Sequence, residues 1–308
     1  MLSVSLKTTP ASTRPEARSD WPGWFALHAA TVLWASTFLV VKDTLGSVAP
    51  SLIVSARFLL AALALSPFLR RHRPALWRAG FESAIWLMLV YVTQTLGLQG
   101  SSASHGAFIS ALYVVIVPLS MRFAGRLVRK SEWFAACTAI IGVWLLSERS
   151  GIGAGDAWLL ASAVFTAILT IRLEVHARRF SSLELSAVMV SAGAALAFVW
   201  LLIERPAVHL ETIPWWSLIY LGVIVTGLST WLMAFGQARI SSAKTAVVFA
   251  LEPVWAAILA FMMIRERLGF EAWFGGGLVV LANLLPRLIG SDSSLRQRSY
   301  VNGLFRRN

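Results

Sequence analysis

The sequence has one cysteine, few histidines and few acids, and these absences exclude several classes of protein. Cys137 has no second cysteine to pair with, so an intrachain disulfide and a thiolate metal cluster are both excluded. With only 15 aspartates and glutamates, the chain offers no clustered acids for catalysis, and we expect no enzymatic activity, metal or cofactor. The five histidines lack the close spacing that a zinc site requires: His28, His72, His105, His176 and His209.

Charged residues of either sign are also scarce, and apolar residues take their place. Of the 308 residues, 14% are charged and 57% are hydrophobic, and the mean hydropathy is +0.70. A soluble domain needs a polar exterior, whereas a lipid bilayer removes that need, so we predict an all-α integral membrane protein. Apolar segments of about 15 to 20 residues give ten expected membrane helices: 24–41, 51–69, 82–98, 106–121, 133–147, 157–173, 183–203, 215–235, 245–264 and 271–289.

The basic residues set the expected orientation in the membrane. A net charge of +12 would also suit nucleic-acid binding, but the lysines and arginines lie between the apolar segments and mostly on one side. By the positive-inside rule, we expect both termini in the cytoplasm and no nucleic-acid partner. Residues 1–20 lack the apolar core of a signal peptide, so the first helix is expected to remain in the mature protein. Few basic residues fall on the other side: Lys42, Arg149, Arg205, Arg265 and Arg267.

The chain contains two copies of one unit. Ser101-Ser102-Ala103 recurs as Ser241-Ser242-Ala243, and Trp133 recurs as Trp273 at the same interval. An odd number of expected spans separates the copies, which predicts an inverted repeat of the kind found in transporters. The expected organisation is a cytoplasmic tail (1–23), a first five-helix repeat (24–148), an external connection (149–156), a second five-helix repeat (157–290) and a basic cytoplasmic tail (291–308).

Two charged residues lie inside expected spans, where a charge is costly. Glu252 stands directly before Pro253 in the ninth span. It is expected either to bind a cation, an ammonium group or a proton, or to cap backbone groups that the proline frees. In the repeat register Glu252 aligns with Leu112, so we expect the acid in one half only. Arg57 in the second span is expected either to hold a substrate carboxylate or to reach the interface or a neighbouring helix.

Polar stripes on the third and eighth spans predict a cavity. Side chains at i, i+3 and i+4 from Tyr91 share one helical face, and a similar pattern starts at Thr226 in the repeat-related helix. We favour a shared cavity, with simple helix packing as the alternative. The expected substrate-binding residues comprise these stripes, the two charged residues, and nearby aromatic and hydroxyl residues: Trp34, Ser36, Thr37, Arg57, Tyr91, Gln94, Thr95, Tyr113, Thr226, Ser229, Thr230, Trp231, Glu252 and Trp255.

Glycines in the fifth and tenth spans predict close helix contacts, because a missing side chain lets backbones approach. Gly142 lies in the fifth span, and Gly275, Gly276 and Gly277 lie in the tenth. Such contacts belong either to a dimer interface or to packing within one chain. We therefore expect a monomer or a weak homodimer.

Five short motifs, in this order along the chain, carry a resemblance to a known family: Leu33-Trp34-Ala35-Ser36-Thr37-Phe38, Arg57-Phe58, Val117-Pro118, Leu251-Glu252-Pro253-Val254 and Arg265-Glu266-Arg267-Leu268. Together they resemble the EamA-type transporters of the drug/metabolite transporter superfamily, over residues 24–290. One departure is visible, because Pro118 and Pro253 stand at different distances from their Ser-Ser-Ala motifs.

The resemblance implies two inverted five-helix repeats around a central cavity, in a bacterial inner membrane. It implies export of small metabolites, and the chain looks most like the amino-acid exporters, including those for aromatic amino acids. Alternating access between the two sides is the expected mechanism, with the substrate and the lipid bilayer as partners. The alternatives are an exporter of other drugs or metabolites, a channel, or a lipid-modifying membrane enzyme.

Overall fold

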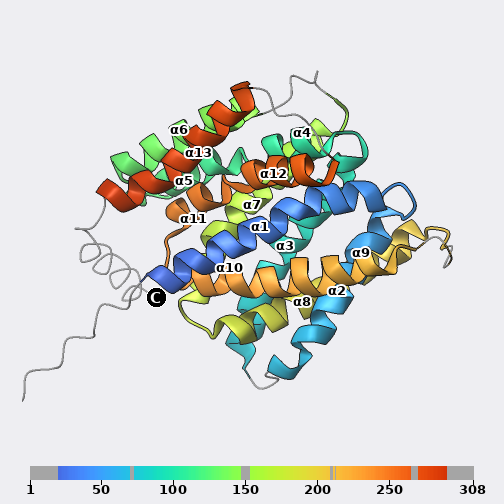
Figure 1. Cartoon of the computed structure of the whole chain (residues 1–308). Coiled ribbons are helices and arrows are strands. Elements are labelled where there is room, and N and C mark those ends of the chain that lie inside the picture. Colours follow the sequence, from blue (N-terminus) through green and yellow to red (C-terminus); the bar gives the residue numbers. More distant parts are fainter. Residues whose placement is uncertain are drawn as a thin grey trace, which may run out of the picture.

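A computed structural model of the chain describes residues 20–69, 73–146, 153–208, 211, 213–264 and 270–289. These residues form helices and turns without a strand, which confirms the predicted all-helical class (Figure 1). Of the remaining predictions, nearly all of the N-terminal tail (1–23), the whole C-terminal tail (291–308) and residues 149–152 of the connection lie outside the described residues.

The helices in chain order are α1 (Trp21–Thr44), α2 (Pro50–Leu65), the 3-10 helix η1 (Ser66–Phe68), α3 (Pro74–Gln99), α4 (Ala103–Ser110), α5 (Tyr113–Phe123), α6 (Lys130–Leu146), α7 (Asp156–Ala177), α8 (Ser182–Glu204), α9 (Trp215–Ile219), the π-helix η3 (Tyr220–Leu228), α10 (Ser229–Gln237), α11 (Ser242–Phe249), α12 (Glu252–Ile264) and α13 (Phe270–Ile289).

Among the described residues, eight helical stretches are long and apolar enough to cross a membrane: Trp21–Thr44, Pro50–Phe68, Pro74–Gln99, His105–Phe123, Asp156–Ala177, Ser182–Glu204, Trp215–Gln237 and Ser242–Leu259. They coincide with eight of the expected ranges. The other two ranges fall on α6, which has 17 residues, and on α13, whose apolar part Trp273–Ala282 is shorter. The total of ten crossings therefore stays a prediction.

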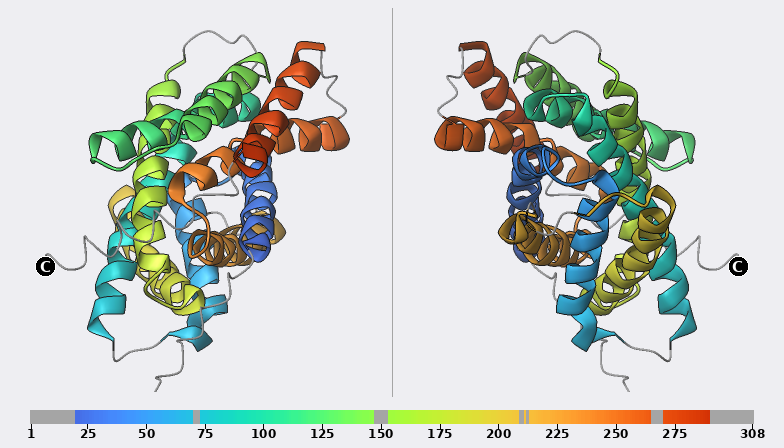
Figure 2. Two further views of the ribbon diagram at one scale, coloured as in Figure 1. Left: turned by 90° about the vertical axis from the view of Figure 1, so that its left-hand side faces the viewer. Right: turned by 90° about the vertical axis from the view of Figure 1, so that its right-hand side faces the viewer.

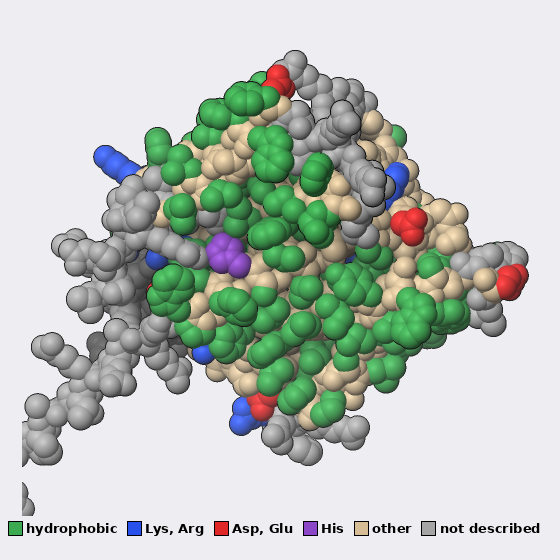
Figure 3. All heavy atoms as spheres, in the orientation of Figure 1, with side chains coloured by type: hydrophobic (Ala, Val, Ile, Leu, Met, Phe, Trp, Pro, Cys, Tyr) green, Lys and Arg blue, Asp and Glu red, His purple; other side chains and the backbone are tan. Residues whose placement is uncertain are grey.

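The exterior of the helix bundle is apolar. Large hydrophobic side chains cover the face seen in Figure 3, and charged side chains lie toward its edges. Phe25, Ile203 and Trp216 are 76%, 75% and 83% exposed, and many other large hydrophobic side chains are exposed with them. Such a surface is suited to lipid.

The two halves of the chain pack into each other. α3 of the first half lies against α7 and α8 of the second, and α1 lies beside α10 (Figures 1 and 2). The crossing of α3 and α7 is so close that a Cβ on Gly155 would come within 2.2 Å of the Gly97 carbonyl oxygen. Only glycine fits there. Because α3 and α7 belong to different halves of the chain, a pocket between α1, α3 and α7 is walled by both halves.

α6 and α13 pack against each other at one edge of the bundle (Figure 1). A Cβ on Gly142 would lie 2.6 Å from the Gly275 carbonyl oxygen, so glycine is needed for this contact. Of the two interpretations of these glycines, packing within one chain describes Gly142 and Gly275. A Cβ on Gly277 would meet nothing within 4 Å.

The fourth and ninth expected spans are each broken near the middle. α4 ends at Ser110 and α5 begins at Tyr113, while α11 ends at Phe249 and α12 begins at Glu252. Both first pieces have eight residues. Tyr113 and Glu252 therefore hold equivalent places in the two copies, as the first residues after each break.

This equivalence corrects the register expected from the Ser-Ser-Ala motifs, which paired Glu252 with Leu112. Ser102 is the N-cap of α4 and Ser241 is the N-cap of α11, so the second copy starts one residue earlier than the motif suggests. The two motifs are identical in sequence, but the N-cap of the helix is the second serine in the first copy and the first serine in the second copy.

The two breaks have different sequence origins. Pro253 is the second residue of α12, where a proline is tolerated because its missing N–H would have no helical partner, and it prevents α11 from continuing. Pro118 lies inside α5, beyond the first break. The Leu112 N–H bonds to the Ile109 carbonyl at 3.1 Å in a tightened last turn of α4. Nothing in the local sequence explains why the chain breaks there.

α7 holds the beginnings of both broken helices, one at each end. At its start, Asp156 bonds to the His105 imidazole of α4 at 3.2 Å and accepts from the Gly153 N–H at 2.9 Å. Near its end, Glu174 accepts from the Ser242 N–H of α11 at 2.8 Å and pairs with Arg178 at 2.8 Å. The two half-helices are thereby anchored at opposite ends of one long helix.

Candidate substrate pocket

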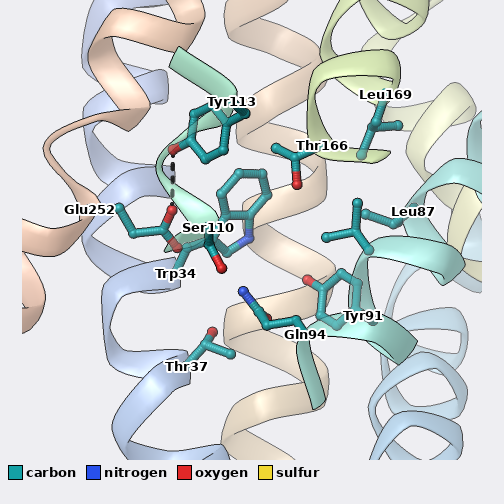
Figure 4. Close-up of a pocket in the computed structure, with 11 residues that line it drawn as sticks. Trp34, Thr37, Leu87, Tyr91, Gln94, Ser110, Tyr113, Thr166, Leu169 and Glu252 are labelled. Carbon is teal, nitrogen blue, oxygen red and sulfur yellow. Dashed lines mark hydrogen bonds between the residues drawn. The ribbon is translucent and has the colours of Figure 1, made fainter. Parts of the chain in front are cut away.

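A pocket lies between the two halves, next to both helix breaks (Figure 4). It contains about 470 Å³ of space free of protein atoms, open solvent included. Its wall combines aromatic rings, aliphatic side chains, hydroxyls, one amide and one carboxyl group, and such mixed walls are typical of small-molecule sites. The lining residues are Trp34 and Thr37 from α1, Leu87, Val90, Tyr91 and Gln94 from α3, Ser110 from α4, Tyr113 from α5, Thr166 and Leu169 from α7, and Glu252 from α12.

The structure brings six of the expected site residues together at this wall: Trp34, Thr37, Tyr91, Gln94, Tyr113 and Glu252. The other eight lie outside the lining: Ser36, Arg57, Thr95, Thr226, Ser229, Thr230, Trp231 and Trp255. Two residues of this second group, Thr95 and Ser229, form hydrogen bonds with residues of the first. The role of either group in substrate binding remains a prediction.

Tyr113 and Glu252 form a hydrogen-bonded pair across the breaks. The Tyr113 hydroxyl donates to a Glu252 carboxylate oxygen at 3.3 Å, and both residues are almost fully buried (Figure 4). Each is the first residue of its helix. The pair places an acid at the pocket wall and links the two repeats there.

Trp34 is fixed in the pocket wall by residues from the second half. Its indole N–H donates to the Ser229 hydroxyl at 2.7 Å, and Ser229 in turn donates to the Val225 carbonyl. The Trp34 ring also packs edge-on against Phe249 at a centroid distance of 4.9 Å. Ser229 therefore positions a lining ring and does not itself line the pocket.

The expected stripe on α3 is only partly a pocket face. Tyr91 and Gln94 point into the pocket (Figure 4). The Thr95 hydroxyl instead donates to the Tyr91 carbonyl at 2.7 Å within the helix. Backbone bonding of this kind is the usual fate of a threonine in a membrane helix, where no water can satisfy its hydroxyl.

The expected stripe on the eighth span faces other helices because a π-helix interrupts it. The Thr226 hydroxyl donates to the Leu221 carbonyl five residues back, at 2.7 Å, and accepts from Arg57 Nε at 3.1 Å. Thr230 is fully buried, and its carbonyl accepts from the Ser186 hydroxyl at 3.3 Å. π-turns are frequent at functional sites, and here one presents Thr226 to the buried Arg57.

The remaining predicted residues do not line the pocket. Ser36 shares a hydrogen bond of 2.8 Å with the Tyr220 hydroxyl of η3. Trp231 packs on Phe235 with ring centroids 5.9 Å apart. Trp255 is half-buried, and its indole nitrogen is buried without a hydrogen-bond partner in the described part of the chain.

Sequence reasoning missed five lining residues: Leu87, Val90, Ser110, Thr166 and Leu169. One of them, Thr166, carried a usable signal in the sequence. Thr166 and Thr170 repeat at i and i+4 on α7, a polar stripe in an apolar helix. Ser110 is the last residue of α4, and its hydroxyl is buried without a partner among the described residues.

Comparison with known proteins identifies the family. Residues 21–148 and 153–286 each match the model of the EamA-like transporter family. The chain belongs to the EamA-like transporter family. The family domain occurs twice, in agreement with the internal repeat, and the family proposed from the motifs is confirmed. This EamA chain is accordingly a multi-pass membrane transporter.

The named relatives of this EamA chain are transporters. An uncharacterized transporter of Archaeoglobus fulgidus is 28% identical over 264 residues, which cover 85% of this chain and 84% of the relative. The uncharacterized inner membrane transporter YedA of Escherichia coli is 24% identical, with coverage of 87% and 91%. A biotin transporter of Escherichia coli is 22% identical, with coverage of 84% and 90%.

A solved crystal structure has the same fold. It superposes on 88% of this chain and 98% of its own, with a TM-score of 0.73 and 17% sequence identity. At that identity the likeness concerns the fold alone, and the residues of the pocket have to be interpreted from this chain.

Proposed function

We propose that this protein exports small metabolites, foremost neutral amino acids and aromatic ones among them, across a bacterial inner membrane. Membership of the EamA family supports transport, and a relative described as an inner membrane transporter supports the location. The distribution of basic residues supports cytoplasmic termini. The protein would act as a monomer or a weak homodimer.

The proposed topology is ten crossings in two inverted five-helix repeats. α4 begins beside Asp156 at one end of α7, whereas α11 begins beside Glu174 at the other. At a rise of 1.5 Å per residue the two acids are about 27 Å apart along α7, close to the thickness of the hydrocarbon layer. Equivalent half-helices that start on opposite sides of a membrane run in opposite directions, which supports the inversion.

The proposed mechanism rests on the position of the pocket beside the two helix breaks, between α4 and α5 and between α11 and α12. In many transporters the substrate binds near the midplane, at the interface of two repeats and at interrupted helices. Here Tyr113 and Glu252 stand at the two interruptions and bond to each other at the pocket wall. Rocking of the two repeats around the pocket would open it first to one side of the membrane and then to the other.

The chemistry of the wall supports an amino acid as substrate. Glu252 provides a carboxylate for an ammonium group, and Trp34, Tyr91 and Tyr113 provide rings for an apolar or aromatic side chain. Polyphosphates such as nucleotide sugars would require several cations at the wall. No lysine or arginine is among the lining residues.

A second candidate is a small metabolite of another kind. The biotin transporter among the relatives favours it, since that protein and this chain share most of their lengths. Its name describes that protein alone, but it makes biotin a sensible member of a substrate panel.

Counterflow in proteoliposomes tests the proposal. Purified protein is reconstituted into vesicles loaded with unlabelled substrate, and uptake of the labelled compound is followed for tryptophan, phenylalanine, leucine, glutamate and biotin. We expect saturable counterflow that is fastest for the aromatic amino acids, with the compound recovered chemically unchanged. Counterflow of biotin alone would favour the second candidate, and flux without counterflow would indicate a channel.

The Glu252→Gln variant tests the role of the carboxylate, with Glu204→Gln as its matched control. Glu204 ends α8 and is exposed, so the same chemical change there should leave transport unchanged. Glu252→Gln should lower amino-acid counterflow about tenfold to a hundredfold, the usual weight of a charge-assisted hydrogen bond. Equal rates in the two variants would remove Glu252 from substrate binding.

A further inference from the structure

Arg57 on α2 is a buried cation without an anion beside it. Its side chain is 0% exposed, and both terminal guanidinium nitrogens lack a hydrogen-bond partner within the described residues. The guanidinium interacts electrostatically with Tyr91, but no hydrogen bond of ordinary geometry joins those nitrogens to the Tyr91 hydroxyl. In the described ranges of the chain no carboxylate pairs with Arg57. Such an unpaired charge costs free energy, and a purely structural role would not require it.

The orientation of the guanidinium is set from one side only. Its Nε donates to the Thr226 hydroxyl at 3.1 Å, and Thr226 is held by its own bond to the Leu221 carbonyl in the π-helix. The fork formed by the two terminal nitrogens is left without a hydrogen-bond partner. That fork is the part of an arginine that binds a carboxylate with two parallel hydrogen bonds.

Tyr91 contacts this cation and also lines the pocket. The guanidinium carbon is 4.3 Å from the centroid of the Tyr91 ring. Tyr91 lines the pocket and Arg57 does not. Figure 4 shows the Tyr91 ring at the pocket wall, on the side opposite Glu252. The Tyr91 ring also packs edge-on against Phe58, with ring centroids 5.3 Å apart.

We propose that Arg57 is a binding site for a carboxylate group and that Tyr91 covers it in the conformation described. While the site is empty, the π face of the Tyr91 ring stabilises the charge of the Arg57 guanidinium. A substrate carboxylate then replaces the ring as the partner of the guanidinium. The inference rests on the proposed function in that the ligand enters through the transport pocket. It adds to that function a substrate class, which is small organic carboxylates.

Binding of two matched probes to the full-length protein tests the site. 3-Phenylpropionate carries a ring and a carboxylate without an ammonium group, and phenethylamine carries the same ring and an ammonium group without a carboxylate. We expect Arg57→Met to weaken 3-phenylpropionate about tenfold to a hundredfold and to leave phenethylamine unchanged. Isothermal titration calorimetry in detergent measures both affinities.

Variants of Tyr91, the residue that covers Arg57, complete the binding test. Tyr91→Ala should bind acetate, a carboxylate without a ring, more tightly than the wild type, because no side chain has to move away from Arg57. Tyr91→Phe keeps the ring and is the matched control, with an affinity near that of the wild type. If neither the wild type nor Tyr91→Ala binds 3-phenylpropionate, phenylalanine or millimolar acetate, the site does not exist and the proposal is overturned.

Thermal unfolding separates the anion site from a structural role of Arg57. Met has a similar length and no charge, and Thr226 keeps its bond to the Leu221 carbonyl, so Arg57→Met should unfold at the wild-type temperature or above it. A lower unfolding temperature with equal loss of both probes would show that Arg57 only fastens α2 to η3, and the proposal would fall.

The anion site and the proposed transport function can fail separately. Amino-acid counterflow that Arg57→Met leaves unchanged would keep the transport proposal and refute the carboxylate site. Arg57-dependent binding of 3-phenylpropionate without counterflow of any amino acid would keep the site and refute the proposed substrate.

Discussion

The two broken helices, α4 with α5 and α11 with α12, use the same backbone device with different chemistry. Each starts with an eight-residue piece and resumes two residues later at the pocket wall. The first resumes with Tyr113 and the second with Glu252, so one copy supplies a neutral hydroxyl and the other an ionisable acid. The two copies therefore share their backbone geometry, while the part of the pocket wall that they form is asymmetric.

The two pieces also differ in how their N-termini are held. α4 is capped within its own chain segment, since the Ser102 hydroxyl accepts from the His105 N–H at 3.2 Å. α11 has no side-chain cap from Ser241, and Glu174 of α7 instead accepts from the N–H and the hydroxyl of Ser242. The first piece therefore has a local cap in addition to its contact with Asp156 of α7, whereas the second depends on Glu174 of α7.

The largest expected effect follows from replacing the anchors on α7. Glu174→Ala leaves the N-terminus of α11 and the Arg178 guanidinium without a buried acceptor, which should cost about 3 kcal/mol. Asp156→Ala removes a less buried contact and should cost about 1 kcal/mol. Thermal unfolding in detergent measures both. Equal losses would show that the two half-helices are anchored alike.

A smaller effect is expected from substitutions of Tyr113 and Glu252, the two residues at the breaks. Glu252→Gln replaces the carboxyl group of the wall with an amide and should lower amino-acid counterflow by about 2 kcal/mol of transition-state stabilisation. Tyr113→Phe removes one long hydrogen bond of 3.3 Å and should lower it by less than about 1 kcal/mol. Initial rates at several substrate concentrations give both values. A larger loss for Tyr113→Phe would make the bond between the repeats, and not the acid, the important element.

The fifth and tenth spans allow a similar contrast between the halves. Gly142→Ala drives a methyl group against the Gly275 carbonyl at 2.6 Å and should destabilise the protein by about 1 to 2 kcal/mol. Gly277→Ala meets open space and should be neutral or slightly stabilising. Unfolding temperatures and size-exclusion profiles of both variants check this. A change of oligomeric state in Gly277→Ala would point to a dimer contact at that glycine.

The smallest expected effect compares the two N-cap serines. Ser102→Ala removes a cap and should cost about 1 kcal/mol. The Ser241 hydroxyl is buried without a partner among the described residues, so Ser241→Ala should change stability by less than about 0.5 kcal/mol or increase it. Hydrogen exchange at the first amides of α4 and α11 reports each cap directly. Faster exchange in α11 of Ser241→Ala would contradict the difference.

Much of the fold was accessible from the sequence because it depends on local composition. Apolar runs predicted the helical class and the positions of the helical segments, and the repeated motifs predicted the double domain. The polar stripe on α3 and the acid of the ninth span led to Tyr91, Gln94 and Glu252. These residues stand out in an apolar chain, where each polar group needs a reason.

Other features of the site could not be predicted, because they depend on contacts or on backbone geometry. The π-helix η3 turns Thr226 toward Arg57, while an ordinary helix was expected there. The break between α4 and α5 contains no proline that would indicate it in the sequence. Ser110 joins the wall only because α4 ends at that residue.

The sequence by itself determined that this protein lies in a membrane, where its helices fall and that its unit is repeated, since hydropathy and repetition are properties of the chain alone. Only the tertiary structure decided which groups meet. Tyr113 and Glu252 are 139 positions apart, and Arg57 and Thr226 are 169 positions apart. The physical reason is that a buried polar side chain must find its partner in space, and packing of the two halves brings those partners together.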